Sequence, residues 1–259
     1  MYRFLVTPRW LGFHLLVLAL IPAFFFLGKW QYGRFEARSA ASTQITANLK
    51  EPVVSLESVD TVGGTVPKAM RYRSVTVTGR YDPAHEVVVR RRTQNSRVGF
   101  YVVTPLVTSQ GAVLVNRGWV PAGATADAHP RVPAPPGGDV TVTGRLRPAE
   151  SEDDTGIRNR GGLPPGQVLL IDTGVIGKSL PYQLFGGFVE LTEQEPQADP
   201  APDPVPRPDV GGGGGLNLAY AVQWWIFIGV GVGGWAMLIR REARDLRKAG
   251  QESPAKASV

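Results

Sequence analysis

The sequence predicts an α+β membrane protein in which two antiparallel transmembrane helices flank an extracytoplasmic, antiparallel β-rich domain of barrel or sandwich type. Three observations lead to this prediction. Residues 10–28 and 219–239 are apolar runs, and about 20 helical residues are needed to cross a hydrocarbon core of roughly 30 Å. The residues between these runs repeatedly alternate β-branched and polar side chains. A strongly basic stretch follows the second run.

The first apolar run is interpreted as a retained helix and not as a cleaved signal peptide. Its length exceeds the apolar core of about 7–15 residues that is typical of signal peptides. Lys29, Trp30 and Arg34 follow it at once, in place of a small-residue cleavage site. Both runs are apolar around the whole helix circumference, which favours lipid over the interior of a soluble domain.

The basic stretch decides the predicted topology. Residues 240–248 contain five basic and two acidic side chains, and the positive-inside bias places such a segment in the cytoplasm. Two spans put both termini on the same side. The sequence therefore predicts a two-span protein of the cell membrane, with both termini cytoplasmic and the central domain outside the cytoplasm.

The expected order of segments follows from these boundaries. It is a cytoplasmic N-terminus (1–9), a first transmembrane helix (10–30), a β-rich domain (31–194), a Pro/Gly-rich linker (195–215), a second transmembrane helix (216–239) and a basic cytoplasmic tail (240–259). In the linker, proline recurs at nearly every second position before a run of five glycines, so a stiff part should precede a flexible one. The polar residues 251–259 are expected to be disordered.

Alternating patterns mark the strands of the central domain. They lie at residues 71–80, 86–90, 100–104, 112–116, 140–144, 167–172 and 188–191. Short Gly, Pro or Asp turns separate them without intervening helical patterns, which favours an antiparallel sheet. A short helix is expected within residues 44–56. The string Val-Thr-Val-Thr-Gly-Arg occurs at 75–80 and again at 140–145, either as a duplicated unit or because it is simply good strand sequence.

Composition excludes several functional classes. Without cysteine, the chain has no disulfide, no thiolate chemistry and no cysteine-based zinc site. The formal charge of +6 lies partly in the membrane-flanking segments and accompanies no nucleic-acid-binding signature, so no nucleic-acid partner is expected. No nucleophile–base pair, metal-ligand cluster or phosphate-binding glycine loop is recognisable, and the chain is predicted not to be an enzyme.

Five strings then occur in a characteristic order. They are Leu-Gly-Lys-Trp-Gln-Tyr-Gly-Arg (27–34), the strand from Tyr72-Arg73 to Tyr81-Asp82, Gly-Phe-Tyr-Val-Val-Thr-Pro-Leu (99–106), Val-Asn-Arg-Gly-Trp-Val-Pro (115–121) and Tyr-Ala-Val-Gln-Trp (220–224). In this order and topology, residues 10–240 resemble the Surfeit locus protein 1 family of cytochrome c oxidase assembly factors. The Pro/Gly-rich linker departs from the family pattern.

The resemblance implies a non-enzymatic membrane helper that binds haem A transiently and favours its insertion into oxidase subunit I. Subunit I, other oxidase components and membrane lipid are the implied partners. The family pattern has a histidine shortly before the Tyr-Ala pair, where this chain has Asn217. An amide is a poor iron ligand, whereas imidazole is a common one. Two alternatives stay open: a stably bound accessory subunit of the oxidase without haem, and a membrane-tethered extracytoplasmic sensor or binding module.

The expected site lies where the first helix ends and the second begins. A closed hairpin would bring together Trp30, Gln31, Arg34, Asn217, Tyr220, Gln223 and Trp224. Flat rings and amides suit a porphyrin face, and a cation such as Arg34 could pair with its propionates. The alternative interpretation is the aromatic belt common to membrane proteins, although an amide inside a span, as at Gln223, usually has a partner.

His14 is the only intramembrane candidate for a haem ligand, and no other metal site is predicted. It lies at the opposite end of the first helix from Trp30, where it should meet Gly231, Gly233, Gly234 or Trp235. An imidazole in lipid is costly, so a role in haem ligation or in contacting the oxidase is one interpretation. Hydrogen bonding to a backbone carbonyl, or reaching toward the headgroups, is the other.

Two basic motifs of the central domain leave further alternatives. Arg90, Arg91 and Arg92 either protect a solvated strand end from edge pairing or face an anionic ligand or partner. The Asn-Arg-Gly-Trp string at 116–119 is predicted to end a strand in a turn. Arg117 would pair there with a buried carboxylate or with a partner.

Overall fold

A computed structural model describes residues 3–123, 128–158, 161–211 and 214–252 of the chain. The chain divides into two compact units. The helical unit combines the two ends of the sequence, Met1–Ser42 and Val210–Val259, and the β unit is the continuous stretch Thr43–Asp209. The last seven residues of the predicted disordered tail, 253–259, lie outside the described residues.

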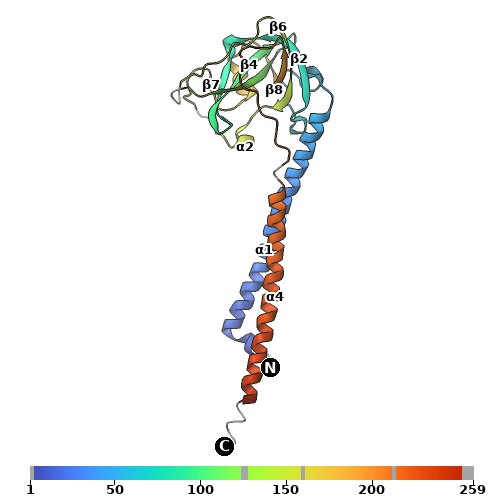
Figure 1. Cartoon of the computed structure of the whole chain (residues 1–259), viewed down its shortest axis with the longest axis vertical. Coiled ribbons are helices and arrows are strands. Elements are labelled where there is room, and N and C mark those ends of the chain that lie inside the picture. The colour runs from blue at the N-terminus through green and yellow to red at the C-terminus, as the bar shows by residue number, and fades with distance from the viewer. Residues whose placement is uncertain (1–2, 124–127, 159–160, 212–213, 253–259) are drawn as a thin grey trace, which may run out of the picture. The chain divides into compact units, whose positions relative to one another are not determined.

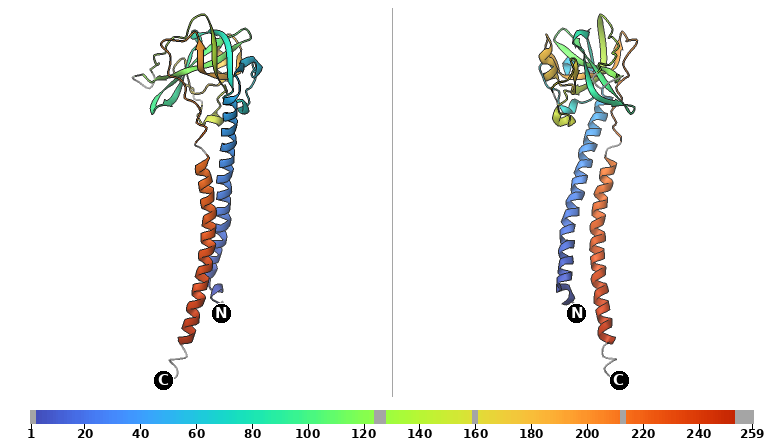
Figure 2. Two further views of the ribbon diagram at one scale, coloured as in Figure 1. Left: turned by 45° about the vertical axis from the view of Figure 1, so that its right-hand side comes forward. Right: turned by 90° about the vertical axis from the view of Figure 1, so that its left-hand side faces the viewer.

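Two long helices make up the helical unit, α1 (Pro8–Lys50) and α4 (Gly215–Glu252), and they run side by side in Figures 1 and 2. A short 3-10 turn, η1 (Arg3–Val6), precedes α1. Each helix contains an 18-residue window apolar enough for a membrane span, with a mean hydropathy of 2.3 in α1 and 1.6 in α4. The two-span arrangement predicted from the sequence agrees with these helices.

Helix α1 continues well beyond residue 30, where the apolar run ends. Residues 31–50 contain many good helix formers and no proline, so the helix stops only before Pro52. The short helix expected within residues 44–56 is therefore partly the last turns of α1. These turns belong to the β unit, where the buried Asn48 amide donates hydrogen bonds to the carbonyls of Ala69 (2.7 Å) and Arg71 (2.9 Å).

The β unit is built mainly from one sheet with short helical turns between its strands (Figure 1). Its strands are β1 (Val54–Ser55), β2 (Ser74–Tyr81), β3 (Val87–Gln94), β4 (Arg97–Val107), β5 (Ala112–Pro121), β6 (Asp139–Pro148), β7 (Gln167–Val168) and β8 (Leu184–Glu195). Its short helices are η2 (Leu56–Ser58), η3 (Lys68–Met70), η4 (Pro83–His85), α2 (Glu152–Thr155), α3 (Thr173–Ile176) and η5 (Gly177–Ser179). All seven predicted strand regions contain a strand, although only two residues of 167–172 are extended.

The strand order is β1-β2-β6-β8-β5-β4-β3-β7, and β2 also pairs with β4 through Arg80↔Val107 and Tyr81↔Leu106. This second pairing curls five strands into a ring, but the sheet as a whole is not a clean barrel. The α+β class is confirmed. The sheet is mixed and not wholly antiparallel, because β1–β2, β3–β7 and β5–β8 are parallel pairs. Side-chain alternation is the same in both directions, so the sequence pattern did not reveal strand direction.

The repeated Val-Thr-Val-Thr-Gly-Arg strings form directly paired strands. In the β2–β6 ladder, Val75 lies opposite Gly144 and Val77 lies opposite Val142. Two threonine hydroxyls face each other across the ladder, with 3.0 Å between Thr78 Oγ1 and Thr141 Oγ1. Alternation gives both strands one face of small apolar side chains toward the core, as expected of good strand sequence.

Strand β5 lies at the centre of the sheet and is buried over nine of its ten residues. It continues to Pro121, so the predicted turn at residues 116–119 is wrong. Gly118 explains the misleading pattern: its φ of +139° and a register shift in the β4–β5 ladder mark an irregularity inside a continuing strand. Arg117, buried in this strand, donates to Glu86 Oε2 at 2.9 Å and to the Pro133 carbonyl at 2.8 Å, so its partner is a carboxylate of the same unit.

The proline-rich stretch is attached to the β unit. Trp119 and Asp203 exchange backbone hydrogen bonds of 2.7 and 2.8 Å, and the Gln94 amide donates to the Pro204 carbonyl at 3.1 Å. Gly118 makes the approach possible, because a Cβ there would lie 2.4 Å from the Asp203 carbonyl oxygen. Of the predicted linker 195–215, the part up to Asp209 therefore belongs to the β unit.

Candidate functional site

The two helices of the helical unit pack in an antiparallel register. The aromatic ring of Phe35 lies 3.0 Å from the position of a Cβ at Gly214, and Trp225 lies against Gly28. Further along, the rings of Phe24 and Trp224 are 5.3 Å apart. This register brings the end of the apolar part of α1 beside the start of α4, as the hairpin prediction requires.

Gly28 is a close-packing position that the sequence motif alone did not explain. A Cβ at this residue would lie 2.3 Å from Trp225 Nε1 and 2.7 Å from its Cδ1, so only glycine lets the indole ring rest there. The Tyr32 ring follows on the same side, with its centroid 6.2 Å from that of Trp225. Glycine at position 28 thus fixes where the second helix crosses the first.

Four of the predicted site residues fall on the opposite side of the hairpin, and we call Trp30, Arg34, Tyr220 and Gln223 the aromatic flank. Phe24 contacts Trp224 and Phe227, which places that side of α4 against one side of α1. At 3.6 residues per turn, Tyr220 and Gln223 lie on the same face of α4 as Phe227, and Trp30 and Arg34 share a face of α1 that turns away from Gly28. The register also brings Trp30 level with Tyr220.

The aromatic flank is exposed in the helical unit. Trp30 and Tyr220 keep 55% and 50% of their surface accessible, and Gln223 is also exposed within an otherwise apolar span. The Arg34 guanidinium lies 5.2 Å from the centroid of the Trp30 ring, an ordinary cation–π distance. An exposed amide at this depth lacks water as a partner, which favours contact with another molecule.

Gln31, Asn217 and Trp224 lie nearer the seam between the helices and are partly buried. The Gln31 side-chain oxygen is buried and accepts no hydrogen bond from the described residues. Unpaired buried acceptors are costly, so a donor from another molecule would stabilise this end of the seam. The seven predicted residues therefore lie near the same end of the hairpin, but three of them face the seam and four belong to the aromatic flank.

His14 belongs to a different place. Sixteen residues separate it from Trp30, which is about 24 Å along the helix axis. Its Nδ1 accepts a hydrogen bond of 2.9 Å from the Trp235 indole N–H, and its ring also contacts that of Trp10 at 5.7 Å. Accepting at Nδ1 leaves the neutral imidazole with its proton on Nε2, so neither nitrogen offers a lone pair to iron in this arrangement.

Trp235 was one of the four expected neighbours of His14, and the glycines behave differently from expectation. A Cβ at Gly231, Gly233 or Gly234 would meet no atom within 4 Å. The side chains of Trp10, His14 and Trp235 hold the helices apart here, so the backbones do not approach at these glycines.

The side chains at the Trp30 end of the hairpin fit part of a haem. Flat rings and an arginine match the porphyrin face and its carboxylate edge. Three of the polar side chains here, Gln31, Asn217 and Gln223, are amides, and the described residues contain no group of three His, Cys, Asp or Glu able to hold a metal. The end therefore fits the ring and its propionates but supplies no imidazole to the iron.

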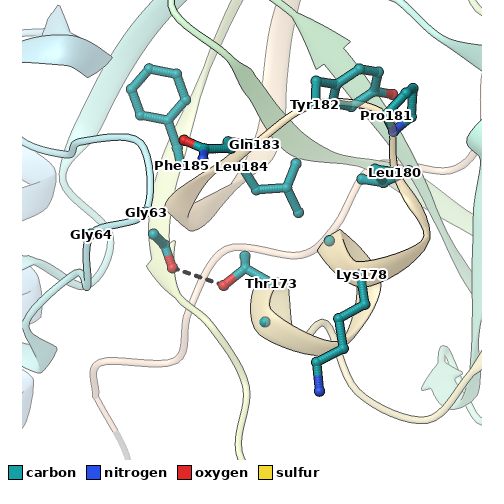
Figure 3. Close-up of a pocket in the computed structure, with 13 residues that line it drawn as sticks. Gly63, Gly64, Thr173, Lys178, Leu180, Pro181, Tyr182, Gln183, Leu184 and Phe185 are labelled. Atoms are coloured by element: carbon teal, nitrogen blue, oxygen red, sulfur yellow. Dashed lines mark hydrogen bonds between the residues drawn. The ribbon is translucent and has the colours of Figure 1, made fainter.

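The β unit also contains a cleft of about 580 Å³, between residues 173–186 and the Gly63-Gly64 turn (Figure 3). The Thr173 hydroxyl donates to the Gly186 carbonyl at 3.2 Å, and Leu184 and Phe185 add apolar surface. Among the described residues that line the cleft, Lys178 is the only charged one, and its side chain extends away from the Gln183–Phe185 stretch in Figure 3. No polar groups converge here as they do in a reaction site.

One cluster of the β unit was not expected from the sequence. Asp82 accepts a hydrogen bond from the Tyr182 hydroxyl at 2.8 Å and lies 2.7 Å from His85 Nδ1. Burial acts to raise the pKa of the Asp82 carboxyl, but the hydrogen bonds with His85 and Tyr182 outweigh it and lower that pKa below its ordinary value. His85 is thus partnered locally, and the hundred residues between Asp82 and Tyr182 hid the contact from sequence reasoning.

The arginine run 90–92 is partly engaged within the β unit. Arg90 donates to Gln167 Oε1 at 2.6 Å, and Arg92 donates to Glu150 Oε2 at 2.5 Å and to the Leu169 carbonyl at 3.2 Å. Arg91 is exposed at a bulge, with a φ of +59°. The run therefore joins a strand to the segment after it, and only Arg91 projects from it.

Comparison with known proteins agrees with the motifs. A model of the SURF1 family matches residues 18–229. The chain is 32% identical to proteins of Mycobacterium bovis and Mycobacterium tuberculosis, each named an uncharacterized SURF1-like protein, over 98% of this chain and 92% of theirs. A SURF1-like protein of Rickettsia felis is 29% identical over 41% of this chain and 45% of its own. The match to the family model includes the aromatic flank and ends short of both His14 and Trp235.

Proposed function

We propose that this chain, which belongs to the SURF1 family, is a membrane assembly factor that holds or delivers haem A for oxidase subunit I. The SURF1 family is associated with cytochrome c oxidase assembly. The aromatic flank is the observation that carries this proposal. One indole ring, one phenol ring, an arginine and an intramembrane amide lie exposed near the same end of a two-helix hairpin. Such a surface supports binding of a flat amphipathic ring or of a partner's transmembrane helix.

The chain's own residues divide the work of holding haem A. Trp30 and Tyr220 offer ring faces, and Arg34 offers a cation for a propionate. Gln31 brings an unpaired acceptor to the seam beside them. Haem A supplies the redox-active iron of the terminal oxidase, and the amide of Asn217 leaves iron ligation to a group outside this end of the hairpin.

The two-span hairpin supports delivery by helix contact within the membrane. Both helices expose apolar side chains along their length, among them Phe26 and Ile226. We place both termini in the cytoplasm and the β unit outside it, because the basic residues gather at the termini of the hairpin. Reporter fusions to the C-terminus and to the β unit test this orientation, and activity of a periplasmic reporter at the C-terminus would contradict it.

Co-purification tests the proposed function. The full chain would be produced together with haem A synthesis, extracted in mild detergent and analysed for bound oxidase subunits and for a haem A spectrum. Trp30→Ala should reduce both signals. Phe25→Ala, which removes an exposed ring about 140° around α1 from Trp30, is the matched control and should leave both unchanged. Absence of every oxidase subunit from the wild-type sample would overturn the assembly role.

A second candidate is a stably bound accessory subunit of the oxidase that binds no haem. Asn217 favours it, because the amide removes the imidazole that the family pattern has at the start of the second helix. An oxidase partner recovered without any haem A signal would support this version. Recovery of haem A with the isolated chain would exclude it, and an unchanged spectrum in His14→Ala would remove His14 as the ligand.

A further inference from the structure

The positive charge of the chain is concentrated in the helical unit. Eleven of the 28 basic residues and four of the 22 acidic residues belong to it, which gives that unit a formal charge of +7 and leaves −1 on the β unit. Within the helical unit, residues 3–9 and 240–248 hold seven basic side chains against two acidic ones. The end of the hairpin where α1 begins and α4 approaches its end is therefore strongly cationic.

A cleft of about 660 Å³ lies at this cationic end, between the first turns of α1 and residues 238–245 of α4. Arg9 and Arg241 line it together with Glu242 and Asp245. Phe13, Leu16 and Leu238 supply its apolar walls. The cleft thus offers charged groups and hydrocarbon surface to a single ligand.

Fixed aromatic rings keep the two helices apart at the cleft. Trp10, which lines it, packs edge-on against Phe4 at 5.2 Å and contacts His14 at 5.7 Å. His14 in turn holds Trp235 of α4 through the 2.9 Å hydrogen bond. Gly12 widens the space further, because a Cβ there would meet no atom within 4 Å. The opening is therefore built by side chains with their own packing partners.

The arginines of the cleft retain donors for a ligand. Arg9 has no ion pair with any of the described residues. Arg241 Nε lies 3.9 Å from Asp245 Oδ2, which is longer than a hydrogen bond, and both side chains are more than half exposed. Glu242 and Asp245 bring negative charge to the lining, but the seven basic residues around this end outnumber them.

We propose that this cleft binds one molecule of an anionic phospholipid, with its phosphate on Arg9 and Arg241 and an acyl chain along Phe13, Leu16 and Leu238. Guanidinium groups pair with phosphate oxygens bidentately, and a free phosphate would leave the apolar walls unused. The net positive field at this end selects a lipid with net negative charge over a zwitterionic one. The site lies at the opposite end of the hairpin from the aromatic flank and does not depend on the proposed function.

Native mass spectrometry of the full chain in mild detergent tests the proposal. Phosphatidylglycerol, phosphatidylcholine with the same acyl chains, and glycerol phosphate would be added in separate samples. One bound phosphatidylglycerol is expected, retained about fivefold more than phosphatidylcholine, with no retained glycerol phosphate. Equal retention of the two lipids, preference for phosphatidylethanolamine in a further sample, or binding of glycerol phosphate alone would each overturn it.

Three variants separate the cleft from general attraction of the basic end to lipid. Arg241→Gln should lower phosphatidylglycerol retention about fivefold, and Arg244→Gln, which removes the same charge from an exposed residue outside the cleft, should not. Gly12→Leu fills the open space beside Gly12 in the cleft without changing charge and should lower retention as well. Equal losses in Arg241→Gln and Arg244→Gln, or full retention in Gly12→Leu, would show that no specific cleft is used.

Discussion

In the β unit, several charged side chains are buried beside partners, whereas among the described residues of the helical unit no charged side chain is buried and many apolar side chains are exposed. Glu190 and Arg145 are 4% and 5% exposed and lie against each other within the sheet. On α1, by contrast, Leu15 keeps 68% of its surface accessible. The β unit therefore has a core of its own, while the helical unit needs lipid or a partner to cover it. The difference indicates that the β unit carries the stability of the protein and the hairpin carries its interactions.

The largest expected effect comes from breaking a buried charge group of the β unit. Glu190 pairs with both Arg145 and Arg147, and although burial raises the pKa of its carboxyl, the two guanidinium groups counter that shift. Glu190→Ala would leave two arginines without a counter-charge and should destabilise the β unit by about 4 kcal/mol. Chemical unfolding of the full chain in detergent, followed by far-UV circular dichroism, measures this loss. Glu193→Ala on the exposed side of the same strand should change it little.

The same truncation should have unequal effects in the two units. Leu114→Ala opens a cavity in the fully buried centre of the sheet and should cost about 3 kcal/mol of unfolding free energy. Leu15→Ala removes an exposed side chain that lipid or detergent can replace, so its effect should stay below about 0.5 kcal/mol. Thermal unfolding of both variants gives the comparison. Similar losses would show that the exposed face of α1 is covered by protein.

A smaller effect is expected at the polar contact between the two spans. Trp235→Phe keeps an aromatic ring, although a smaller one, but removes the N–H that donates to His14, and it should weaken the hairpin by about 1 kcal/mol. A double-mutant cycle with His14→Ala isolates the coupling free energy between the two side chains. The unfolding free energies are measured by titration with a denaturing detergent. Coupling near zero would mean that the two helices are held without this hydrogen bond.

The smallest expected effect is a pH dependence in the β unit. Because the folded-state pKa of Asp82 is lowered, its contribution to stability is present above the ordinary value of 3.8 and is lost as the pH falls through the folded-state value. Wild-type protein should therefore lose stability more steeply below about pH 4 than Asp82→Asn does. Unfolding midpoints measured from pH 3 to 6 test this. Asp139→Asn, at an exposed carboxyl, should retain the wild-type slope.

The helical spans and most strands could be predicted because their signals are local. An apolar run of about 20 residues and a two-residue alternation depend only on neighbouring side chains. The predicted turn at 116–119 failed for the same reason, since Asn116 and Gly118 resemble a turn locally but lie in a central strand. The partner of Arg117 was left open by the sequence because Glu86 lies on a different segment.

The candidate site could likewise be predicted only in part from the sequence. The sequence identified Trp30, Gln31, Tyr220 and Gln223 as unusual residues at a membrane boundary, and it showed that Asn217 replaces an expected histidine. It did not show that Gln31 turns to the seam while Trp30 and Tyr220 remain exposed. That distinction depends on the rotation of each helix about its axis, which Trp225 packing on Gly28 fixes.

The sequence by itself determined the two spans, the concentration of basic residues at their terminal ends, the strand-rich domain and the family, because hydropathy, charge and motif order are properties of the chain alone. Only the tertiary structure decided the mixed direction of the sheet, the attachment of the proline-rich stretch to β5, the engagement of His14 by Trp235 and the cleft beside Arg9. Each of these joins residues that are far apart in the chain, and such contacts depend on how the elements pack.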